Sequence, residues 1–482
     1  MVDVAVVGSG PNGLAAAVTM ARAGLSVQVF EAADSVGGGT RTKELTLPGF
    51  RHDVCAAVHP MALASPFFRA FELSRRIDLL VPEISYGHPL DGGRAGIAYR
   101  SLDRTVEALG PDGRAWRTLM APLLRRLDGV IDFTQGSLLR VPKDPLAAIQ
   151  YGMRTLLQGT PAWNLGFKEA VAPAMLTGVS AHAIGRLPAL STAGAGMLLG
   201  VLAHAGGWPV ARGGSQAIAQ AMADDLLAHG GRIEVAHRVD SFADIKSATG
   251  AKAVVFNTTP RALVAMAGKE MPSQYVRKLE SFKYGAGVCK VDFALSGPVP
   301  WTALELRKAP TLHLGGTREA IALAENEVLA GRHPENPYVL AVQAGVVDDS
   351  RAPAGQHTFW AYTHVPAGST RDCTEDIIRS VEKYAPGFRD LILATSTQTA
   401  QDVGHYNANY IGGDISSGAV TMKQLLKRPV IAADPWRTPV PGLYLGSAST
   451  TPGPSVHGMG GWLAAKSALK NTFGLPAPEL GL

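Results

Sequence analysis

Short apolar runs alternate with a helical pattern at the start of the chain. Val2–Val7 is an apolar run that predicts a buried strand, and Leu14–Ala23 has the small, alanine-rich face of a helix packed tightly on a sheet. Ser26–Phe30 predicts a second strand. A strand, a helix and a strand in this order predict a parallel βαβ unit.

A glycine-rich turn joins the first of these strands to the helix. Gly8, Gly10 and Gly13 form a GxGxxG pattern, and the second strand ends in Glu31. In this context Gly8 permits a sharp turn, Gly10 lets the backbone approach a pyrophosphate, and Gly13 lets helix and strand touch. The helix N-terminus would face the phosphates, and Glu31 would accept hydrogen bonds from a ribose hydroxyl. The sequence therefore predicts a dinucleotide site.

The same alternation returns later in the chain. Ala217–His229 predicts a helix, Arg232–Val239 a strand, and Ala253–Pro260 a buried strand that ends at a polar turn. Near the C-terminus an apolar strand after Pro441 runs into a Gly/Pro-rich turn and then into an alanine-rich helix over Leu463–Lys470. Because such a turn again presents amides and a helix N-terminus, we expect these segments to re-enter the first domain, which is then discontinuous.

Two stretches between these blocks carry no dinucleotide signal. Trp116–Leu199 is largely helical in pattern, and Glu280–Ala432 mixes helices with strands. Together they predict a substrate domain and cap, and no second GxGxxG in a strand–helix context indicates an NAD(P)H domain. The elements expected in the second stretch are strands at Gly287–Leu295, Tyr338–Val342 and His357–Val365 and a helix at Thr374–Tyr384.

Composition and charge narrow the class of protein. The 482 residues are 46% hydrophobic and are enough for two intertwined domains. The net charge of +5 comes without a Lys/Arg block, so we expect no nucleic-acid partner. Cys55, Cys289 and Cys373 are widely separated and form neither a CxxC nor a metal spacing. The cysteines therefore argue against a disulfide reductase and a metal site, and they favour a reducing, cytoplasmic location.

One weakly charged window invites comparison with a membrane segment. Leu187–Gly207 is long enough, but Pro188, several glycines and His204 dilute its hydrophobicity. We expect a buried helix or the wall of an apolar substrate cavity, and leave peripheral membrane contact open. Since Val2–Val7 follows Met1 directly and is needed for the nucleotide fold, no cleavable signal peptide is expected.

A second glycine-rich segment, Gly37–Thr42, follows Glu31. It resembles the Gly-Gly doublet of flavin amine oxidases and carotenoid desaturases, where the backbone and an arginine lie along FAD. Further similar segments are His52–Phe68, Trp208–Gln216, Lys290–Leu295, Asp348–Trp360, Asn407–Gly418 and the turn Thr451–Gly461.

On these segments nearly the whole chain resembles FAD-dependent members of the phytoene desaturase/flavin amine oxidase superfamily. It is most similar to the carotenoid-desaturase-like branch that includes the pyridine nucleotide-disulfide oxidoreductase domain-containing protein 2 group. Thr451, Pro454 and Ser455 stand where many desaturases have a histidine and two glycines. This departure puts a carotenoid substrate in doubt.

The resemblance implies an α/β fold with a discontinuous, Rossmann-like FAD-binding domain of the glutathione reductase type and an inserted α+β substrate or cap domain. We assign 1–90, 205–275 and 432–482 to the FAD-binding domain, and 91–204 and 276–431 to the substrate domain. The residues expected to contact FAD are Gly8, Gly10, Pro11, Asn12, Gly13, Glu31, Gly38, Gly39, Thr40, Arg41, Val239, Ser447, Val456, Gly458 and Met459.

Three residues are candidates for proton handling. Lys290 sits in an otherwise apolar strand, and it resembles the lysine that holds a water at flavin N5 in flavin amine oxidases. His59 and His457 lie in segments that resemble those around the flavin, and imidazole titrates near neutrality. The alternatives are a lysine that reaches solvent from the strand edge and histidines that only make structural hydrogen bonds.

We expect an FAD-dependent oxidoreductase, either a dehydrogenase/desaturase or an oxidase. It would transfer a hydride from a C–H bond of a largely apolar small molecule to flavin N5, forming C=C or C=N, with oxygen or a quinone as electron acceptor. Two alternatives stay open: a double-bond isomerase with reduced FAD, and a non-catalytic FAD-binding protein. A homodimer is also left open, and the substrate itself cannot be read from the sequence.

Overall fold

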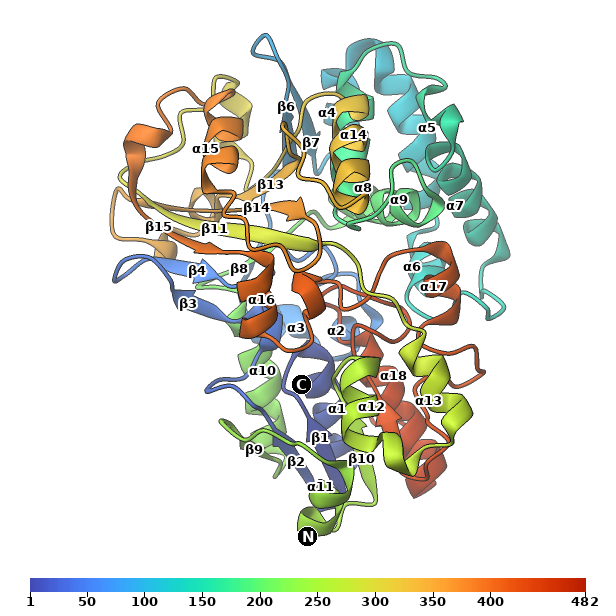
Figure 1. Cartoon of the computed structure of the whole chain (residues 1–482). Coiled ribbons are helices and arrows are strands. Elements are labelled where there is room, and N and C mark those ends of the chain that lie inside the picture. Colours follow the sequence, from blue (N-terminus) through green and yellow to red (C-terminus); the bar gives the residue numbers. More distant parts are fainter.

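Five parallel strands form the first sheet of the computed structural model, which describes residues 1–482. The order is β16-β10-β1-β2-β9, so the N-terminal strand lies at the centre. Figure 1 shows this sheet in the lower lobe, near the N-terminus. The strands are β1 (Val4–Val7), β2 (Val27–Phe30), β9 (Arg232–Glu234), β10 (Ala253–Phe256) and β16 (Leu443–Leu445).

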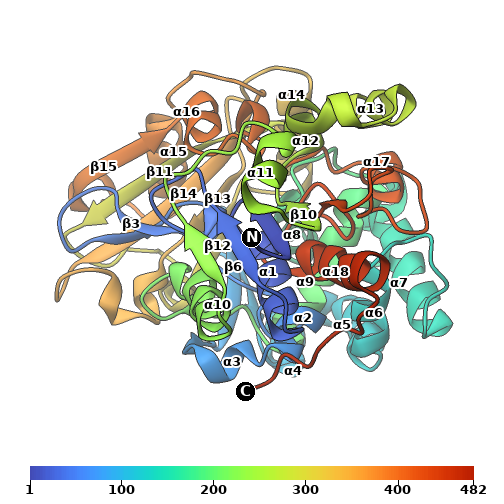
Figure 2. The same cartoon turned by 90° about the horizontal axis from the view of Figure 1, so that it is seen from below.

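Helices cover both faces of this sheet, which explains why β1 is apolar at every position. Val4 and Val6 pack against α1 (Pro11–Arg22), α10 (Gln216–Ala228) and α18 (Met459–Ala468). Ala5 and Val7 pack on the opposite side with α11 (Phe242–Thr249), α12 (Pro260–Ala267) and α13 (Ser273–Glu280). Figure 2 shows α1 between α10 and α18.

Seven strands form the second sheet, in the order β15-β11-β14-β13-β12-β6-β7. All neighbours are antiparallel except β12 and β6. Odd-numbered residues of β11 and β14 face α15 (Thr374–Glu382), whereas Trp360 and Tyr362 face α14 (Arg318–Leu329). The strands are β6 (Ile84–Pro89), β7 (Ala95–Tyr99), β11 (Gly287–Leu295), β12 (Thr311–Leu314), β13 (Val339–Val342), β14 (His357–Val365) and β15 (Ile392–Gln398).

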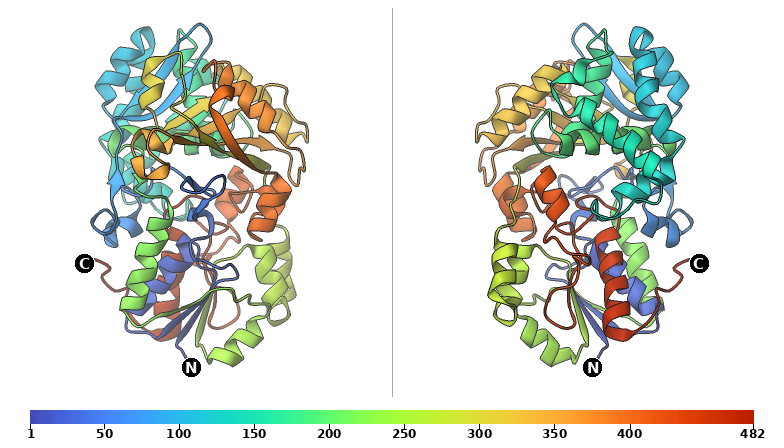
Figure 3. Two further views of the ribbon diagram at one scale, coloured as in Figure 1. Left: turned by 90° about the vertical axis from the view of Figure 1, so that its left-hand side faces the viewer. Right: turned by 90° about the vertical axis from the view of Figure 1, so that its right-hand side faces the viewer.

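A helical layer packs on the second sheet. Figure 3 shows from both sides the two lobes of the molecule, one built on each sheet. α9 (Leu190–Ala205) is the buried helix expected from the weakly charged window Leu187–Gly207. No helix is both long and apolar enough to cross a membrane. The helices of this layer are α4 (Leu102–Ala108), α5 (Gly113–Leu124), α6 (Leu127–Thr134), α7 (Pro145–Gln158), α8 (Val171–Ala181) and α9 (Leu190–Ala205). The smaller helices are α2 (Pro66–Ala70), α3 (Leu73–Arg76), α16 (Ala400–Tyr406) and α17 (Met422–Lys427). Two short strand pairs complete the fold: β3 (Thr42–Glu44) pairs with β4 (Arg51–Asp53), and β5 (Leu79–Leu80) pairs with β8 (Val210–Ala211).

The observed bounds refine the expected ones. β11 and β14 have the predicted bounds, but β9 ends at Glu234 rather than at Val239. The chain turns there because Ala236 adopts a positive φ of 53° and its N–H donates to the carbonyl of Ala33. The domain division stays a prediction; all five parallel strands fall in its FAD-binding segments, whereas β6, which precedes residue 90, pairs in the second sheet.

Candidate functional site

One cavity of about 1050 Å³ lies between the two lobes, and both contribute to its wall. Gly8, Gly10 and Glu31 line one end, at the C-terminal edge of the parallel sheet. The other end is lined by α6, α7 and α9 and by Trp360 and Tyr362 of β14. Small-molecule pockets commonly measure ~300–1,000 Å³, so this volume suits a ligand of more than ordinary size.

Glu31 is held rigidly at the end of the cavity that Gly8 and Gly10 also line, which we call the dinucleotide end. Its Oε2 accepts hydrogen bonds from the Ser9 N–H at 2.9 Å and the Ser9 hydroxyl at 2.6 Å, and its Oε1 accepts from the Ala33 N–H at 2.9 Å. Arg41 Nη2 lies 3.2 Å from Oε1. These contacts fix the carboxylate at the end of β2, where the cavity begins.

The N-terminus of α1 presents its backbone to the same end of the cavity. The helix has Gly10 as its N-cap, which brings no capping side chain of its own, and its first turn holds no acidic residue. The side-chain oxygen of Asn257 accepts from the N–H groups of Gly10 and Gly13 at 3.2 and 3.1 Å. A Cβ on Gly13 would lie 2.0 Å from the Gly8 carbonyl, so only glycine permits this helix–strand contact.

Arg41 connects the Gly-Gly doublet to a distant segment. Its Nε and Nη2 donate to the Ser35 carbonyl at 2.9 and 2.6 Å, and its Nη1 donates to the Tyr406 hydroxyl at 3.2 Å. A Cβ on Gly39 would lie 2.2 Å from the Tyr410 hydroxyl. The doublet therefore packs closely against the segment that follows α16, and both line the cavity.

The C-terminal turn forms another part of the wall, but His457 is fully engaged within it. Its Nδ1 accepts the Met459 N–H at 3.0 Å and its Nε2 donates to the Gly453 carbonyl at 3.1 Å. Burial lowers the pKa of His457 to about 4. This ring lines the cavity as a neutral group that holds the turn.

Most of the residues expected to contact FAD line this one cavity, although they come from four separate parts of the chain. Gly13, Gly458 and Met459 do not line it and instead support the turns behind it. Those that line it are Gly8, Gly10, Pro11, Asn12, Glu31, Gly38, Gly39, Thr40, Arg41, Val239, Ser447 and Val456.

These residues fit a bound FAD. The α1 N-terminus has no protein anion in front of it, which suits a pyrophosphate, and the Glu31 carboxylate suits a ribose hydroxyl. A side chain on Gly10 would meet the Asn257 amide at 2.9 Å, so the turn keeps its backbone bare.

Lys290 lies behind the cavity wall rather than in it. Its ammonium donates to Asp292, and its Nζ is 5.6 Å from the centre of the Trp360 ring. The carboxylate of Asp292 also lies 3.4 Å from His52 Nδ1. Burial raises the pKa of Asp292 to about 6 and lowers that of His52 to about 3. Lys290 lines a separate, small cavity of about 10 Å³ that shares Trp360 and Tyr362 with the large one.

His59 is also placed behind the wall. The Ser215 hydroxyl donates to the Ala56 carbonyl at 2.6 Å, so His59 Nε2 is the donor to Ser215 Oγ at 2.7 Å. Burial lowers the pKa of His59 to about 4. The proton-handling roles predicted for His59, His457 and Lys290 stay predictions, but only His457 reaches the large cavity.

The other end of the cavity, lined by α6, α7 and α9, carries no formal charge. We call it the substrate end, or substrate chamber. Among the charged residue types, only Glu31, Arg41 and Arg238 line the cavity, and all three belong to the dinucleotide end. The helical wall instead offers hydroxyl, amide and imidazole groups, among them His182, whose Nε2 lies 2.7 Å from Nε2 of the buried His313. Burial lowers the pKa of His182 to about 3, so this imidazole is neutral.

Sequence reasoning missed His182, Tyr410 and Asn257 as site residues. Asn257 stands at the end of a predicted strand, where a ligand of a parallel sheet binds, so its position was a usable signal. Tyr410 lies in Asn407–Gly418, whose resemblance to the flavin enzymes was a signal. Nothing local marks His182, because its exposure to the cavity depends on contacts with distant segments.

Removal of the Glu31 charge should weaken FAD binding. In Glu31→Gln one carboxylate oxygen becomes an NH₂ group, which donates and cannot accept, so the side chain can no longer accept from both the Ser9 N–H and the Ala33 N–H. Hydrogen bonds to charged groups contribute ~1.5–3 kcal/mol. We expect the Kd for FAD to rise ~10- to 100-fold, measured by fluorescence titration of apoprotein. Glu234→Gln, at the end of the neighbouring strand β9, is the matched control; equal losses in both variants would contradict this role of Glu31.

Comparisons with known proteins agree with this geometry. Residues 6–71 match the family model described as an NAD(P)-binding Rossmann-like domain. Pyridine nucleotide-disulfide oxidoreductase domain-containing protein 2 from Rattus norvegicus is 24% identical over 545 residues, covering 96% of this chain and 92% of the relative.

Solved structures show the same fold along the whole chain. An oxidoreductase from Methanosarcina mazei has a TM-score of 0.60 and 15% identity, covering 97% of this chain and 99% of that one. Cyclohexylamine oxidase from Brevibacterium oxydans has a TM-score of 0.56 and 15% identity, covering 97% of each chain. The predicted resemblance and the Rossmann-like fold class are confirmed, and the prediction of an FAD-dependent oxidoreductase agrees with these findings.

Proposed function

We propose that this protein is an FAD-dependent oxidoreductase that removes a hydride from a C–H bond of a neutral, largely apolar small molecule. The observation that carries the proposal is the large cavity, which joins a dinucleotide site to an uncharged chamber between α7, α9 and β14. Only one parallel sheet with a GxGxxG turn is present, so no second dinucleotide site competes for the role.

The residues of this chain divide the work by position. Bound FAD would supply a hydride acceptor at flavin N5. Glu31, the α1 N-terminus and Arg41 would hold the nucleotide part, and the turn around Ser447 and Val456 would line its other side. Trp360 and Tyr362, with the helical wall, would enclose the substrate and limit its contact with water.

The absence of charge in the chamber argues for a neutral substrate. The cyclohexylamine oxidase that shares this fold acts on an amine, and a cationic amine gains most from a carboxylate partner. Here no Asp or Glu lines the substrate end of the cavity, so an ammonium group would be desolvated without a carboxylate to balance its charge. We therefore place C=C formation, or C=N formation from an uncharged amine, ahead of oxidation of a cationic amine.

The first test identifies what the purified protein holds. Native mass spectrometry and absorbance should detect FAD, and organic extraction should release any retained substrate. The protein is then mixed anaerobically with the neutral-lipid fraction and, separately, with the amine fraction of a cell extract. We expect the neutral fraction to bleach the oxidised flavin band.

Each outcome separates the candidate functions. Bleaching by the amine fraction alone would contradict the neutral-substrate proposal. Product formation without bleaching would point to isomerisation with reduced FAD. A protein that takes up no FAD from solution would overturn the proposal as a whole.

A further inference from the structure

Helix α7 carries an apolar stripe on its solvent side. Leu146, Ile149, Met153 and Leu156 follow the spacing of one helix face, and Ile149, Met153 and Leu156 are 56%, 61% and 56% exposed. The helix already buries Tyr151 against the protein core. α7 is therefore apolar on two sides, although only one of them is packed.

Exposed apolar residues also occur on two further segments, which contribute Leu138, Met422 and Leu425 to the wall of the same cavity. Leu139 and Val141 precede α7, and Leu426 and Ile431 belong to and follow α17; all four are exposed. We call these eight residues the α7 rim. Of the 17 exposed large hydrophobic residues of the chain, eight are in the rim, although the rim occupies two short stretches. A concentration of this kind marks an interaction surface.

The α7 rim borders the wall of the substrate chamber. Leu156 is exposed and also lines the cavity, together with Tyr151 and Thr155 of α7. Met422 and Leu425 line it from α17. α6, α7 and α17 are all on the right-hand side of Figure 1. An apolar path therefore runs from the surface into the chamber.

Basic residues flank this surface. Residues 125–158 and α17 hold seven lysines and arginines but only three acidic residues, an excess of four positive charges in a chain whose net charge is five. Asp132 and Asp144 are already paired with Arg140 and Arg126, and the Lys143 side chain is 83% exposed. An apolar surface with a basic border complements an anionic lipid surface.

We infer that the α7 rim docks on an anionic lipid surface, from which the apolar substrate enters the chamber between α7 and α17. The docking stands on the rim and its charge; only the role in substrate entry rests on the proposed function. A second copy of the chain fits this surface less well, since a two-fold interface would place the two basic borders against each other.

Vesicle flotation tests this inference on the flavin-loaded protein. We expect flotation with phosphatidylcholine–phosphatidylglycerol vesicles, weaker flotation with phosphatidylcholine alone, and release at high salt. The double variant Ile149→Glu/Met153→Glu should lower partitioning at least ~10-fold, because it places two charges in the apolar stripe. Leu323→Glu/Leu329→Glu on α14 changes two residues that are also exposed and should float like the unaltered protein.

Three results would overturn the inference. In the first, the unaltered protein floats with neither kind of vesicle. In the second, the α7 double variant floats as well as the unaltered protein. In the third, that variant converts a dimer to a monomer without a change in flotation. Sedimentation velocity reports the last case, which would assign the rim to a second copy. FAD absorbance, measured on the same samples, shows that each variant is folded. A failure of the proposed enzymatic function would leave the flotation readout unaffected.

Discussion

Acidification from about pH 7.5 to about pH 5.5 should remove much of the free energy of unfolding of this protein. Seven histidines inside the protein have a pKa that burial lowers far below the ordinary value of 6.5. The pKa falls to about 3 for His52 and His182 and to about 4 for His59, His88, His204 and His457. Burial also holds the pKa of His313 well below 6.5.

The direction of this change in the free energy of unfolding follows from the number of protons bound by the folded and the unfolded state. Below pH 6.5 the unfolded chain protonates these histidines while the folded protein keeps them neutral, so stability falls as the pH drops from about 6.5 towards 4. Asp292 opposes this trend by up to one proton, because burial raises its folded pKa to about 6. Each histidine contributes about 1 kcal/mol per pH unit, and the sum is large beside a typical stability of ~5–15 kcal/mol.

Urea unfolding at several pH values, followed by tryptophan fluorescence, measures this effect as a fall in the midpoint. His405→Asn is the control, since His405 is exposed and the variant should keep the same pH dependence. A midpoint that stays constant between pH 7.5 and 5.5 would show that these histidines are protonated in the folded state.

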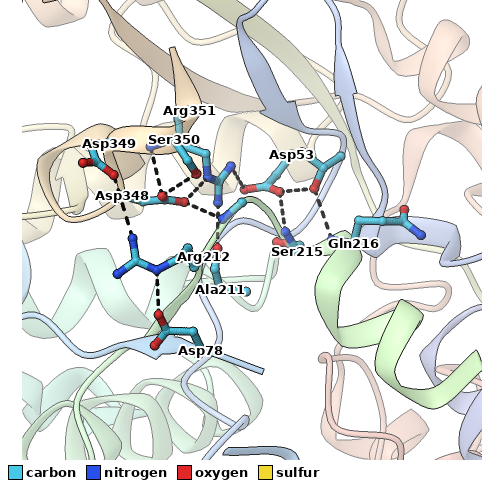
Figure 4. A network of polar contacts seen from close by, with 12 residues as sticks. Asp53, Asp78, Ala211, Arg212, Ser215, Gln216, Asp348, Asp349, Ser350 and Arg351 are labelled. Atoms are coloured by element: carbon cyan, nitrogen blue, oxygen red, sulfur yellow. Dashed lines mark hydrogen bonds and ion pairs between the residues drawn. The ribbon is translucent and has the colours of Figure 1, made fainter. Parts of the chain in front are cut away.

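Substitution of Arg351 by methionine should destabilise the protein by ~3–5 kcal/mol. Figure 4 shows Arg351 between Asp348 and Asp53. Its Nε lies 2.6 Å from Asp348 Oδ2 and its Nη1 lies 2.9 Å from Asp53 Oδ2, and all three side chains are buried. Methionine would fill similar space but leave two buried carboxylates without their cation.

The loss should also weaken FAD binding, since the network supports the Gly-Gly doublet. Asp53 Oδ1 accepts from the Thr42 hydroxyl at 2.7 Å and from the Ser215 N–H at 2.8 Å. Thr42 directly follows Arg41, which lines the cavity. Urea unfolding and FAD titration on one preparation measure both effects.

Arg212→Met is the matched control for Arg351→Met. Arg212 lies in the same network, 2.6 Å from Asp78, but its side chain is 48% exposed. Its loss should leave the urea midpoint unchanged, because solvent replaces the exposed ion pair. Adding Asp53→Asn and Asp348→Asn to Arg351→Met should recover part of the stability. Equal midpoints for the Arg351 and Arg212 variants would contradict the buried-charge argument.

The surroundings of the candidate proton-handling residues could not be predicted from local sequence patterns. Lys290 is a charged residue in a largely apolar strand, and β11 has the predicted bounds. Its partner Asp292 lies two residues on, and thus on the same face of the strand. Whether Lys290 reaches the large cavity depends on β14, because Trp360 and Tyr362 of that strand lie between Lys290 and the cavity. His59 likewise pairs with Ser215, which is 156 residues away.

The sequence by itself determined the dinucleotide half of this protein. The apolar strand, the three glycines and Glu31 act through contacts between near neighbours, and each residue type permits few alternatives: a side chain on Gly13 would collide with the backbone of Gly8. The shape and neutrality of the substrate chamber were decided only by the tertiary structure. They depend on how the helices of Trp116–Leu199 pack on the second sheet, and which side chains then face the cavity follows from long-range packing.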